Sequence, residues 1–423
     1  MTRADLVITG IGELATLAPG PVPRVGAAAR ELGRIPRATV AVDRGRFVYA
    51  GPEARWRRAV ELRHGGVQWD AGGGSVVPGF VDPHTHVLFA GDRAEEIRLK
   101  IEGISYGEIA RRGGGLFQTV RATRRASSAL LLQSAEARLR RMAAMGTTTC
   151  EVKSGYALTP AGERRLLSLV PRLAQRTGLR IVPTFLGAHA VPPEFSERPD
   201  DYVNALISEA LPRIARQHLA DFCDVFCEPG FFTVEQSERL LLAARAHGLG
   251  LKIHADEFVR SGGAALAARL RCRTADHLLE ASEEDRQALA AAGVTAVLLP
   301  ITPFASLASR ASPGREMMDA GVPVALGTDL SPNSWVESMP LVISHGVYGA
   351  RLTPAEALTA ATVNAAHAIG IEDEAGMIAP GRPADFVVFD VPSADHIPYR
   401  LGIIPARVYR RGRRIPPASG ARA

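Results

Sequence analysis

Residues Ser75 to Glu96 read SVVPGFVDPHTHVLFAGDRAEE. The stretch begins with apolar, β-branched residues, and Pro78 and Gly79 mark the start of a predicted strand that ends in His84-Thr85-His86. Alternate residues of a strand point to the same face, so the two histidines aim their imidazoles at one point. Such a pair can bind a metal ion, and a pair of buried histidines that only satisfy hydrogen bonds is the alternative.

Strand-like and helix-like segments alternate along most of the chain after this stretch. Apolar, β-branched runs that predict strands occupy residues 79–86, 147–153, 180–189, 222–230, 250–257, 272–278, 295–300 and 323–329. Runs that predict helices, each starting at Ser or Thr and ending at Gly, occupy residues 128–146, 159–178, 233–248, 282–293 and 353–370. This alternation is typical of a (β/α)₈ barrel, and a doubly wound open sheet has it too.

The positions of the polar residues favour the barrel. In (β/α)₈ enzymes the active site lies at the C-terminal ends of the strands. Polar residues that are candidates for a site stand at or just after the ends of six predicted strands: His84 and His86; Lys153, Ser154 and Tyr156; His189; His254, Asp256 and Glu257; Asp276 and His277; and Asp329. We therefore predict an α/β fold, a (β/α)₈ TIM-like barrel with one site at that end.

The two ends of the chain have a different pattern. Short β-branched runs and a hairpin at 43–51 precede residue 75, and strand-like runs at 377–392 and 403–415 follow residue 375. We predict one small β-sandwich domain formed by residues 1–74 and 376–423, with the barrel, residues 75–375, inserted between its two parts. Two unrelated terminal extensions are the alternative.

Composition narrows the class of protein. The 423 residues suffice for one large and one smaller domain, and no apolar run approaches the roughly 20 residues of a membrane helix. The net charge of +6 comes from dispersed residues without a zinc-finger or RNA-binding signature, so we expect neither nucleic-acid nor membrane binding. Four scattered cysteines predict reduced core thiols, and with no recognisable signal peptide they favour a cytoplasmic protein.

Several separate stretches carry a resemblance to a known family. They are HTHVLFAGDRAEE (84–96), EVKSGYAL (151–158), FLGAHAVPPE (185–194), KIHADEF (252–258), ADHLLEAS (275–282) and ATVNAAHAIG (361–370). Together they resemble the imidazolonepropionase family of metal-dependent amidohydrolases. That family uses water to open the ring of 4-imidazolone-5-propanoate in histidine degradation, giving N-formimidoyl-L-glutamate. The resemblance therefore implies a hydrolase of a cyclic amide C–N bond with a small anionic imidazolone substrate, and we expect a homodimer.

The resemblance also implies a metal site. His84, His86, His254 and Asp329 would bind one divalent ion, and nitrogen and carboxylate ligands suit Zn²⁺ or iron, as Fe²⁺ or Fe³⁺. Binuclear amidohydrolases have a carboxylated lysine on the fourth strand, and residues 222–230 contain no lysine. We interpret Lys252 as a lysine inside the barrel that pairs with a carboxylate.

Further residues receive roles from the resemblance. Arg93, Tyr156 and His189 would bind the substrate, Glu257 would contact its ring, and His277 and Asp329 would transfer protons. The alternatives are an ion pair of Arg93 with Glu95 or Glu96 and simple packing of Tyr156.

The segment after Asp329 departs from the family. Ser331 stands where the family commonly has Asn, and we predict that Ser331, Asn333 and Ser334 contact the substrate. Ser331 is shorter than Asn but can still donate and accept a hydrogen bond. Residues 113–115, three glycines, could form a loop that covers the substrate or a plain turn between helices.

Two other functions compete with this hypothesis. An aromatic-base deaminase could use the same three histidines and one aspartate, although the cationic Arg93 suits an anionic substrate better. A non-catalytic scaffold would be expected to lose ligands, whereas every expected ligand is present.

Overall fold

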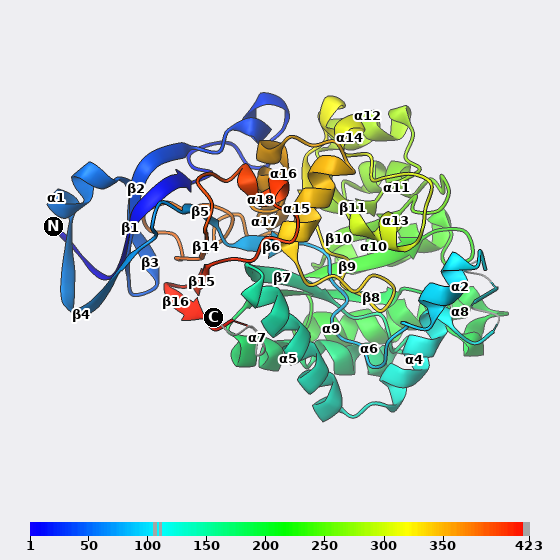
Figure 1. The fold of residues 1–423 in the computed structure, drawn as a ribbon. Helices are drawn as coiled ribbons and strands as arrows, with labels where there is room; N and C mark the ends of the chain where they lie inside the picture. The colour runs from blue at the N-terminus through cyan, green and yellow to red at the C-terminus, as the bar shows by residue number, and fades with distance from the viewer. Residues whose placement is uncertain (105–107, 110–111, 418–423) are drawn as a thin grey trace.

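Eight parallel strands form the centre of the larger part of the molecule (Figure 1). The computed structural model describes residues 1–104, 108–109 and 112–417. The strands follow one another in chain order around the sheet: β6 (Phe80–Asp82), β7 (Thr147–Lys153), β8 (Arg180–Ala188), β9 (Phe222–Cys227), β10 (Gly250–Ala255), β11 (Thr274–His277), β12 (Thr295–Leu298) and β13 (Val324–Leu326). Each coincides with a predicted strand, and helices surround them, so the predicted (β/α)₈ architecture is confirmed.

The barrel closes through the residues just beyond β6 and β13. The Asp329 N–H donates to the His84 carbonyl at 3.1 Å, and the His86 N–H donates to the Leu330 carbonyl at 2.9 Å. Thr85 and Leu330 form an isolated parallel bridge. The prediction that the two histidines lie within the strand is wrong, because β6 ends at Asp82. Pro83 follows with no N–H to extend the ladder, but the bridge at Thr85 keeps both histidines on the barrel.

The helices lie mainly outside the strands. Their bounds are α1 (Trp56–Ala59), α2 (Glu96–Ile101), α4 (Gly115–Arg125), α5 (Ser128–Ala144), α6 (Pro160–Leu167), α7 (Val170–Thr177), α8 (Pro199–Ala205), α9 (Leu211–Arg216), α10 (Val234–Ala246), α11 (Gly263–Leu270), α12 (Glu283–Ala292), α13 (Ile301–Ala305), α14 (Gly314–Asp319), α15 (Met339–Tyr348), α16 (Pro354–Ala360), α17 (Val363–Ala368) and α18 (His396–Tyr399). Capping boxes at Thr233 and Thr353, the first residues of two predicted helices, start α10 and α16.

Two predicted helices are each divided in two. The segment 159–178 breaks between α6 and α7, because Pro171 lacks the N–H that would reach the Leu167 carbonyl and its ring would clash there. The segment 353–370 breaks between α16 and α17. There the Ala361 carbonyl accepts a hydrogen bond from the Val81 N–H at 3.0 Å, so this part of the chain bonds to β6 instead of to its own helix.

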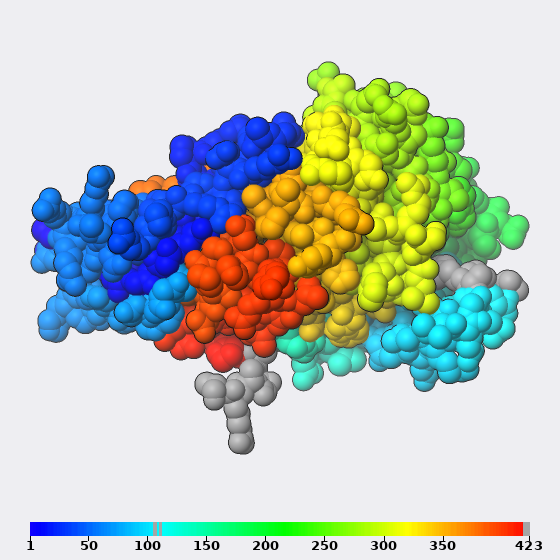
Figure 2. All heavy atoms as spheres, turned by 45° about the horizontal axis from the view of Figure 1, so that its top comes forward, coloured from blue at the N-terminus to red at the C-terminus, as the bar shows by residue number. Residues whose placement is uncertain are grey.

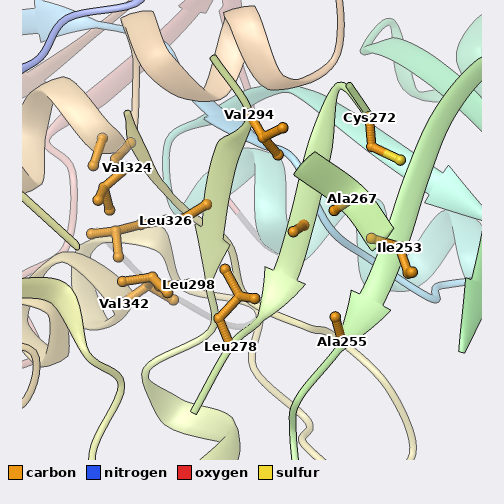
Figure 3. Close-up of a cluster of buried hydrophobic side chains, with 14 of the residues drawn as sticks. Ile253, Ala255, Ala267, Cys272, Leu278, Val294, Leu298, Val324, Leu326 and Val342 are labelled. Atoms are coloured by element: carbon orange, nitrogen blue, oxygen red, sulfur yellow. The ribbon is translucent and has the colours of Figure 1, made fainter. Parts of the chain in front are cut away.

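A continuous apolar layer fixes the strands against the helices. Ile253 of β10, Leu298 of β12 and Leu326 of β13 belong to one buried cluster with Ala267 of α11 and Val342 of α15 (Figure 3). Burying one such aliphatic side chain contributes about 1.5–3 kcal/mol. The strand ends that carry the polar residues therefore stand on a rigid support.

Both ends of the chain form one separate sheet. Its strands are β1 (Thr2–Ala15), β2 (Arg34–Asp43), β3 (Arg46–Pro52), β4 (Val60–Asp70), β5 (Ser75–Pro78), β14 (Phe386–Phe389), β15 (Arg407–Arg410) and β16 (Arg413–Ile415). Their order is β16-β15-β14-β5-β1-β2-β3, with β4 beside β1. The N-terminal and C-terminal segments, blue and red in Figure 2, therefore lie together, as predicted.

Local chemistry explains the hairpin between β2 and β3. Arg44 and Gly45 both have positive φ, 49° and 78°, which fits a two-residue turn with the twist of the strands. Strand β5 lies after residue 75 but pairs with β14 in the terminal sheet, and the first barrel strand, β6, begins at Phe80. The predicted domain boundary at residue 75 therefore stays a prediction.

The cysteines and the helix hydrophobicity are both the subject of predictions from composition. All four cysteines are buried and free, as predicted. Among the described residues, the helices include none that is both long enough and apolar enough to span a membrane.

Candidate active site

Four histidines from three barrel segments converge at the C-terminal end of the barrel. His84 Nε2 lies 3.1 Å from His86 Nε2. The ring centroid of His254 lies 4.6 Å from that of His84, and the His277 centroid lies 5.5 Å from it. All four side chains are buried. The predicted convergence of residues far apart in the sequence is therefore present.

A carboxylate completes the cluster. Asp329 Oδ1 lies 3.6 Å from His84 Nε2 and 3.5 Å from His86 Nε2. Its other oxygen accepts a hydrogen bond from the Thr302 hydroxyl at 2.8 Å, which fixes the carboxylate. Burial raises the pKa of Asp329 to about 6 despite this hydrogen bond.

Two further carboxylates orient the histidines. Asp276 Oδ2 lies 2.6 Å from His84 Nδ1, and Asp224 Oδ1 lies 3.1 Å from His254 Nδ1. A carboxylate at Nδ1 favours the tautomer in which Nδ1 holds the proton and Nε2 presents a lone pair. Both rings therefore direct a lone pair toward the shared point.

This donor set fits a metal ion. His254 Nε2 is buried and has no hydrogen-bond partner among the described residues. Burial lowers the pKa of His84 and of His86 well below the usual range. Both imidazoles are therefore neutral, and each can offer a nitrogen lone pair to a metal ion. Two groups of ligand atoms lie within 4.8 Å of one another, namely His84, His86 and Asp329, and His84, His254 and His277. The predicted ligands belong to these groups, and His277 lies equally close.

The two buried lysines of the barrel are both paired. Lys252 Nζ contacts Glu151 at 2.7 Å and the Pro83 carbonyl at 3.0 Å, which confirms the predicted pairing with a carboxylate. Lys153 Nζ contacts Asp224 at 2.6 Å and Glu151 at 2.8 Å.

A cavity of about 410 Å³ opens above the cluster. Its polar lining includes most of the predicted site residues: His86, Arg93, Tyr156, His189, His254, Glu257, His277, Asp329, Ser331 and Asn333. Phe226, Phe231 and Phe258 contribute an apolar wall. This size and this mixture suit a small planar ring with a polar substituent.

Three predicted substrate-binding residues, Arg93, Tyr156 and His189, line this cavity. The ring centroids of Tyr156 and His189 are 5.1 Å apart, and His189 stacks on His86 at 5.1 Å. His189 Nδ1 lies 3.0 Å from the Gly155 carbonyl, which fixes its ring. Arg93 is buried and makes an ion pair with Glu96 at 2.7 Å, the alternative that the sequence left open, yet it also lines the cavity.

Glu257 and His277 lie next to each other in the lining of the cavity. Glu257 Oε2 lies 3.7 Å from His277 Nε2. Burial, together with the charge of Asp329, raises the pKa of Glu257 well above its usual range. A neutral carboxylic acid at this position can donate a hydrogen bond to a bound ring.

The residues after Asp329 differ in whether they reach the cavity. Ser331 and Asn333 line the cavity, and Asn333 Oδ1 accepts a hydrogen bond from Lys100 Nζ at 2.9 Å. Ser334 is buried and is not among the lining residues, and its carbonyl accepts a hydrogen bond from the Ser331 N–H at 3.0 Å. Ser331 and Asn333 therefore face the cavity, whereas Ser334 supports the loop that carries them.

Buried carboxylates hold the loops that carry these residues. Glu163 accepts hydrogen bonds from the backbone N–H groups of Gly155, Ala157 and Leu158, on both sides of Tyr156. Glu228 does the same for the backbone N–H groups of residues 257–259. The three glycines 113–115 form a turn into α4, and Gly115 donates to Glu96 at 2.7 Å.

Sequence reasoning missed several residues of the site. Thr302 fixes Asp329, Lys100 lines the cavity, and Asp224 orients His254. Thr302 lies just beyond the predicted strand 295–300, so its position at a strand end was a usable signal. Asp224 lies inside the predicted strand 222–230, where an acidic residue in an apolar run was a second one.

Comparison with known proteins agrees with this geometry. The Amidohydrolase family model matches residues 75–409, and members of that family bind a metal. An imidazolonepropionase from Symbiobacterium thermophilum is 48% identical over 418 residues, which are 98% of each chain. The chain belongs to the imidazolonepropionase family. An imidazolonepropionase from Bacillus velezensis is 42% identical over 99% of both chains.

Solved structures share the fold of this imidazolonepropionase family member. A zinc-bound adenosine deaminase from Xanthomonas campestris has a TM-score of 0.72 at 18% identity, with coverage of 98% of this chain and 93% of that one. Atrazine chlorohydrolase from Arthrobacter aurescens, complexed with zinc, has a TM-score of 0.69 at 17% identity, with coverage of 97% and 94%. At these identities the likeness supports the fold alone, so it does not favour the deaminase alternative.

Proposed function

We propose that the protein hydrolyses the cyclic amide C–N bond of 4-imidazolone-5-propanoate and releases N-formimidoyl-L-glutamate. The relatives that carry the name imidazolonepropionase match nearly the whole chain, which supports the reaction. The observation that carries the proposal is the cavity itself, where the histidine and aspartate cluster lies beside Arg93, Tyr156 and His189. The enzyme would thus bind an anionic ring directly over a group of metal ligands.

One divalent ion, zinc or iron, would be held by His84, His86, His254 and Asp329. A metal ion in such a site acts as a Lewis acid and makes water more acidic. A count of one is supported because Lys153 and Lys252 are already paired with carboxylates and β9 contains no lysine. The orienting carboxylates Asp224 and Asp276 support the ligand role of His254 and His84.

Ring opening requires two proton movements. The attacking water must lose a proton, and the ring nitrogen that leaves must gain one. Asp329 and His277 are the candidates for these transfers, since both line the cavity beside the ligand cluster. Glu257, kept neutral by burial, would donate a hydrogen bond to the ring while Tyr156 and His189 fix its plane.

Arg93 would bind the propionate carboxylate. A carboxylate that leaves water needs a cationic partner, and a guanidinium offers two parallel hydrogen bonds. The ion pair with Glu96 uses Nε and one terminal nitrogen, and it holds the guanidinium at the cavity wall. Lys100, which also lines the cavity, adds positive charge at the same wall.

Steady-state kinetics of Arg93→Ala test the proposed substrate. We expect kcat/KM for imidazolone propionate to fall by an amount equivalent to about 2–4 kcal/mol, the usual cost of removing one partner of a buried charge pair, with metal content unchanged. Arg93→Lys should restore only part, because a single ammonium cannot make the bidentate contact.

The matched control is the same ring without its carboxylate. This compound should be a poor substrate and nearly indifferent to the substitution. Equal turnover of the acid and the tail-less ring by the unmodified enzyme, or full efficiency of Arg93→Ala, would contradict the assignment of the carboxylate to Arg93.

A further inference from the structure

Lys153 lies directly beneath the ligand cluster. It is the last residue of β7, and its side chain is fully buried. Its backbone N–H donates to the carbonyl of Thr85 at 3.0 Å, the residue between His84 and His86. The backbone of Lys153 therefore already holds the two-histidine segment against the barrel.

The ammonium group of Lys153 contacts the carboxylates that orient the histidines. Its Nζ lies 2.6 Å from Asp224 Oδ2 and 3.7 Å from Asp276 Oδ2. Asp224 is the partner of His254 Nδ1, and Asp276 is the partner of His84 Nδ1. Among the described residues, Lys153 is the one ammonium group within 4 Å of both carboxylates.

We propose that Lys153 is a positioning residue for the metal, because one ammonium group joins the two carboxylates that aim His84 and His254. Each carboxylate has two oxygens to share between an imidazole and other donors. Lys153 occupies Asp224 Oδ2 and so leaves Asp224 Oδ1 for His254. The two ligand histidines are thereby connected through one side chain although one follows β6 and the other lies in β10.

The buried charge supports the same inference. Glu151, Asp224 and Asp276 are three fully buried carboxylates in one layer beneath the ligands. Lys252 pairs with Glu151 in that layer, and Lys153 contacts all three carboxylates. Removing the Lys153 ammonium takes the paired cation away from Asp224, whereas Lys252 still acts on Asp276. Asp224, left beside two other buried carboxylates, would then turn away from His254.

Metal binding by two lysine variants tests the proposal. Lys153→Met keeps an unbranched side chain, one atom shorter, and removes its charge. Lys252→Met makes the same change in the same buried layer, on an ammonium group that makes no ion pair with Asp224. The apparent Kd for Zn²⁺ is measured by competition with a chelator, and the visible spectrum of the Co²⁺-loaded protein reports ligand geometry. We expect a Kd raised about 10–100-fold and an altered spectrum in Lys153→Met, the range typical of groups that orient metal ligands. Lys252→Met should raise the Kd less than Lys153→Met does, because Lys252 acts on Asp276 but makes no ion pair with Asp224.

A double-mutant cycle examines the route through Asp224. Asp224→Asn should weaken Zn²⁺ binding, and adding Lys153→Met to it should cost less than Lys153→Met costs alone, because both act on His254. Strictly additive losses, an unchanged Kd in Lys153→Met, or equal losses in the two lysine variants would overturn the proposal. If Lys153→Met does not fold, Lys153→Gln, which keeps a donor without the charge, undergoes the same measurements and must meet the same criteria.

This inference rests on the metal site proposed above, and the two can fail separately. An unmodified protein that binds no divalent ion would refute the site itself. An unmodified protein that binds one ion, with Lys153 variants that bind it equally well, would refute only the role of Lys153.

Discussion

Glu163 offers the sharpest test of how the site is held together. Its carboxylate is fully buried at the start of α6, where Oε2 accepts from the Gly155 N–H at 2.5 Å. Oε1 accepts from the N–H groups of Ala157 and Leu158 at 2.7 and 2.6 Å. These three donors lie on both sides of Tyr156, so the carboxylate fixes the backbone that presents this side chain to the cavity.

Glu163→Gln changes one atom and should have a large effect. Both carboxylate oxygens accept hydrogen bonds, but an amide has one oxygen and an NH₂ group that can only donate. In its better orientation the glutamine keeps the bonds from Ala157 and Leu158 and turns its NH₂ group toward the Gly155 N–H. One charge-assisted bond is lost and a buried donor is left without a partner, which together should lower the free energy of unfolding by about 2–4 kcal/mol.

Urea unfolding and kinetics measure the two consequences. We expect a lower unfolding midpoint in Glu163→Gln and a reduced kcat/KM for imidazolone propionate, because Tyr156 loses its fixed position. Glu102→Gln is the control, since Glu102 makes an exposed ion pair with Arg98 and its loss should cost less than about 0.5 kcal/mol. Native stability in Glu163→Gln would refute the reasoning, because it would mean that the loop holds itself.

Three further predictions concern the metal, proton transfer and pH. Elemental analysis should find about one divalent ion per chain, and His84→Ala should lose both the ion and turnover; two ions per active chain would contradict the ligand assignment. His277→Ala should keep the ion and lose roughly two to four powers of ten in rate, whereas loss of the ion would make His277 a ligand. Burial would raise the pKa of Glu356, but hydrogen bonds from Arg315, Thr353 and Arg30 lower it to about 2. Its contribution to stability, about 1–2 kcal/mol, should therefore be present above pH about 4.5 and disappear as the pH falls toward 2, seen as a shrinking difference between the native protein and Glu356→Gln in acid unfolding.

The barrel could be predicted from the sequence because its strands are short, apolar and β-branched, and β7 has the predicted bounds 147–153. The helix breaks were harder for different reasons. Pro171 was a local signal that the periodic pattern of 159–178 outweighed. The break at Ala361 has no local signal, since it depends on a hydrogen bond that its carbonyl accepts from Val81, a residue of β6 that is far away in the sequence.

The candidate site was predictable where strand ends carry unusual residues. His84, His86, His254 and Asp329 stand at such ends, and the structure brings them together. Lys100 and Glu163 could not be recognised in the same way, because each lies in a helical segment of ordinary composition. Their importance comes from which distant backbone or side chain they face, and only the folded chain establishes that.

The closure of the barrel has a consequence for how the protein is made. His84 and His86 leave the ribosome early, whereas Asp329 and Leu330, which bond to the same segment, emerge only after seven further strands. A growing chain therefore has two exposed imidazoles but not the carboxylate that completes their cluster. The terminal sheet has the same delay, because β5 remains without its partner β14 until nearly the whole chain has been synthesised. Translation that stops before Asp329 thus yields a chain with an open barrel and an unfinished sheet.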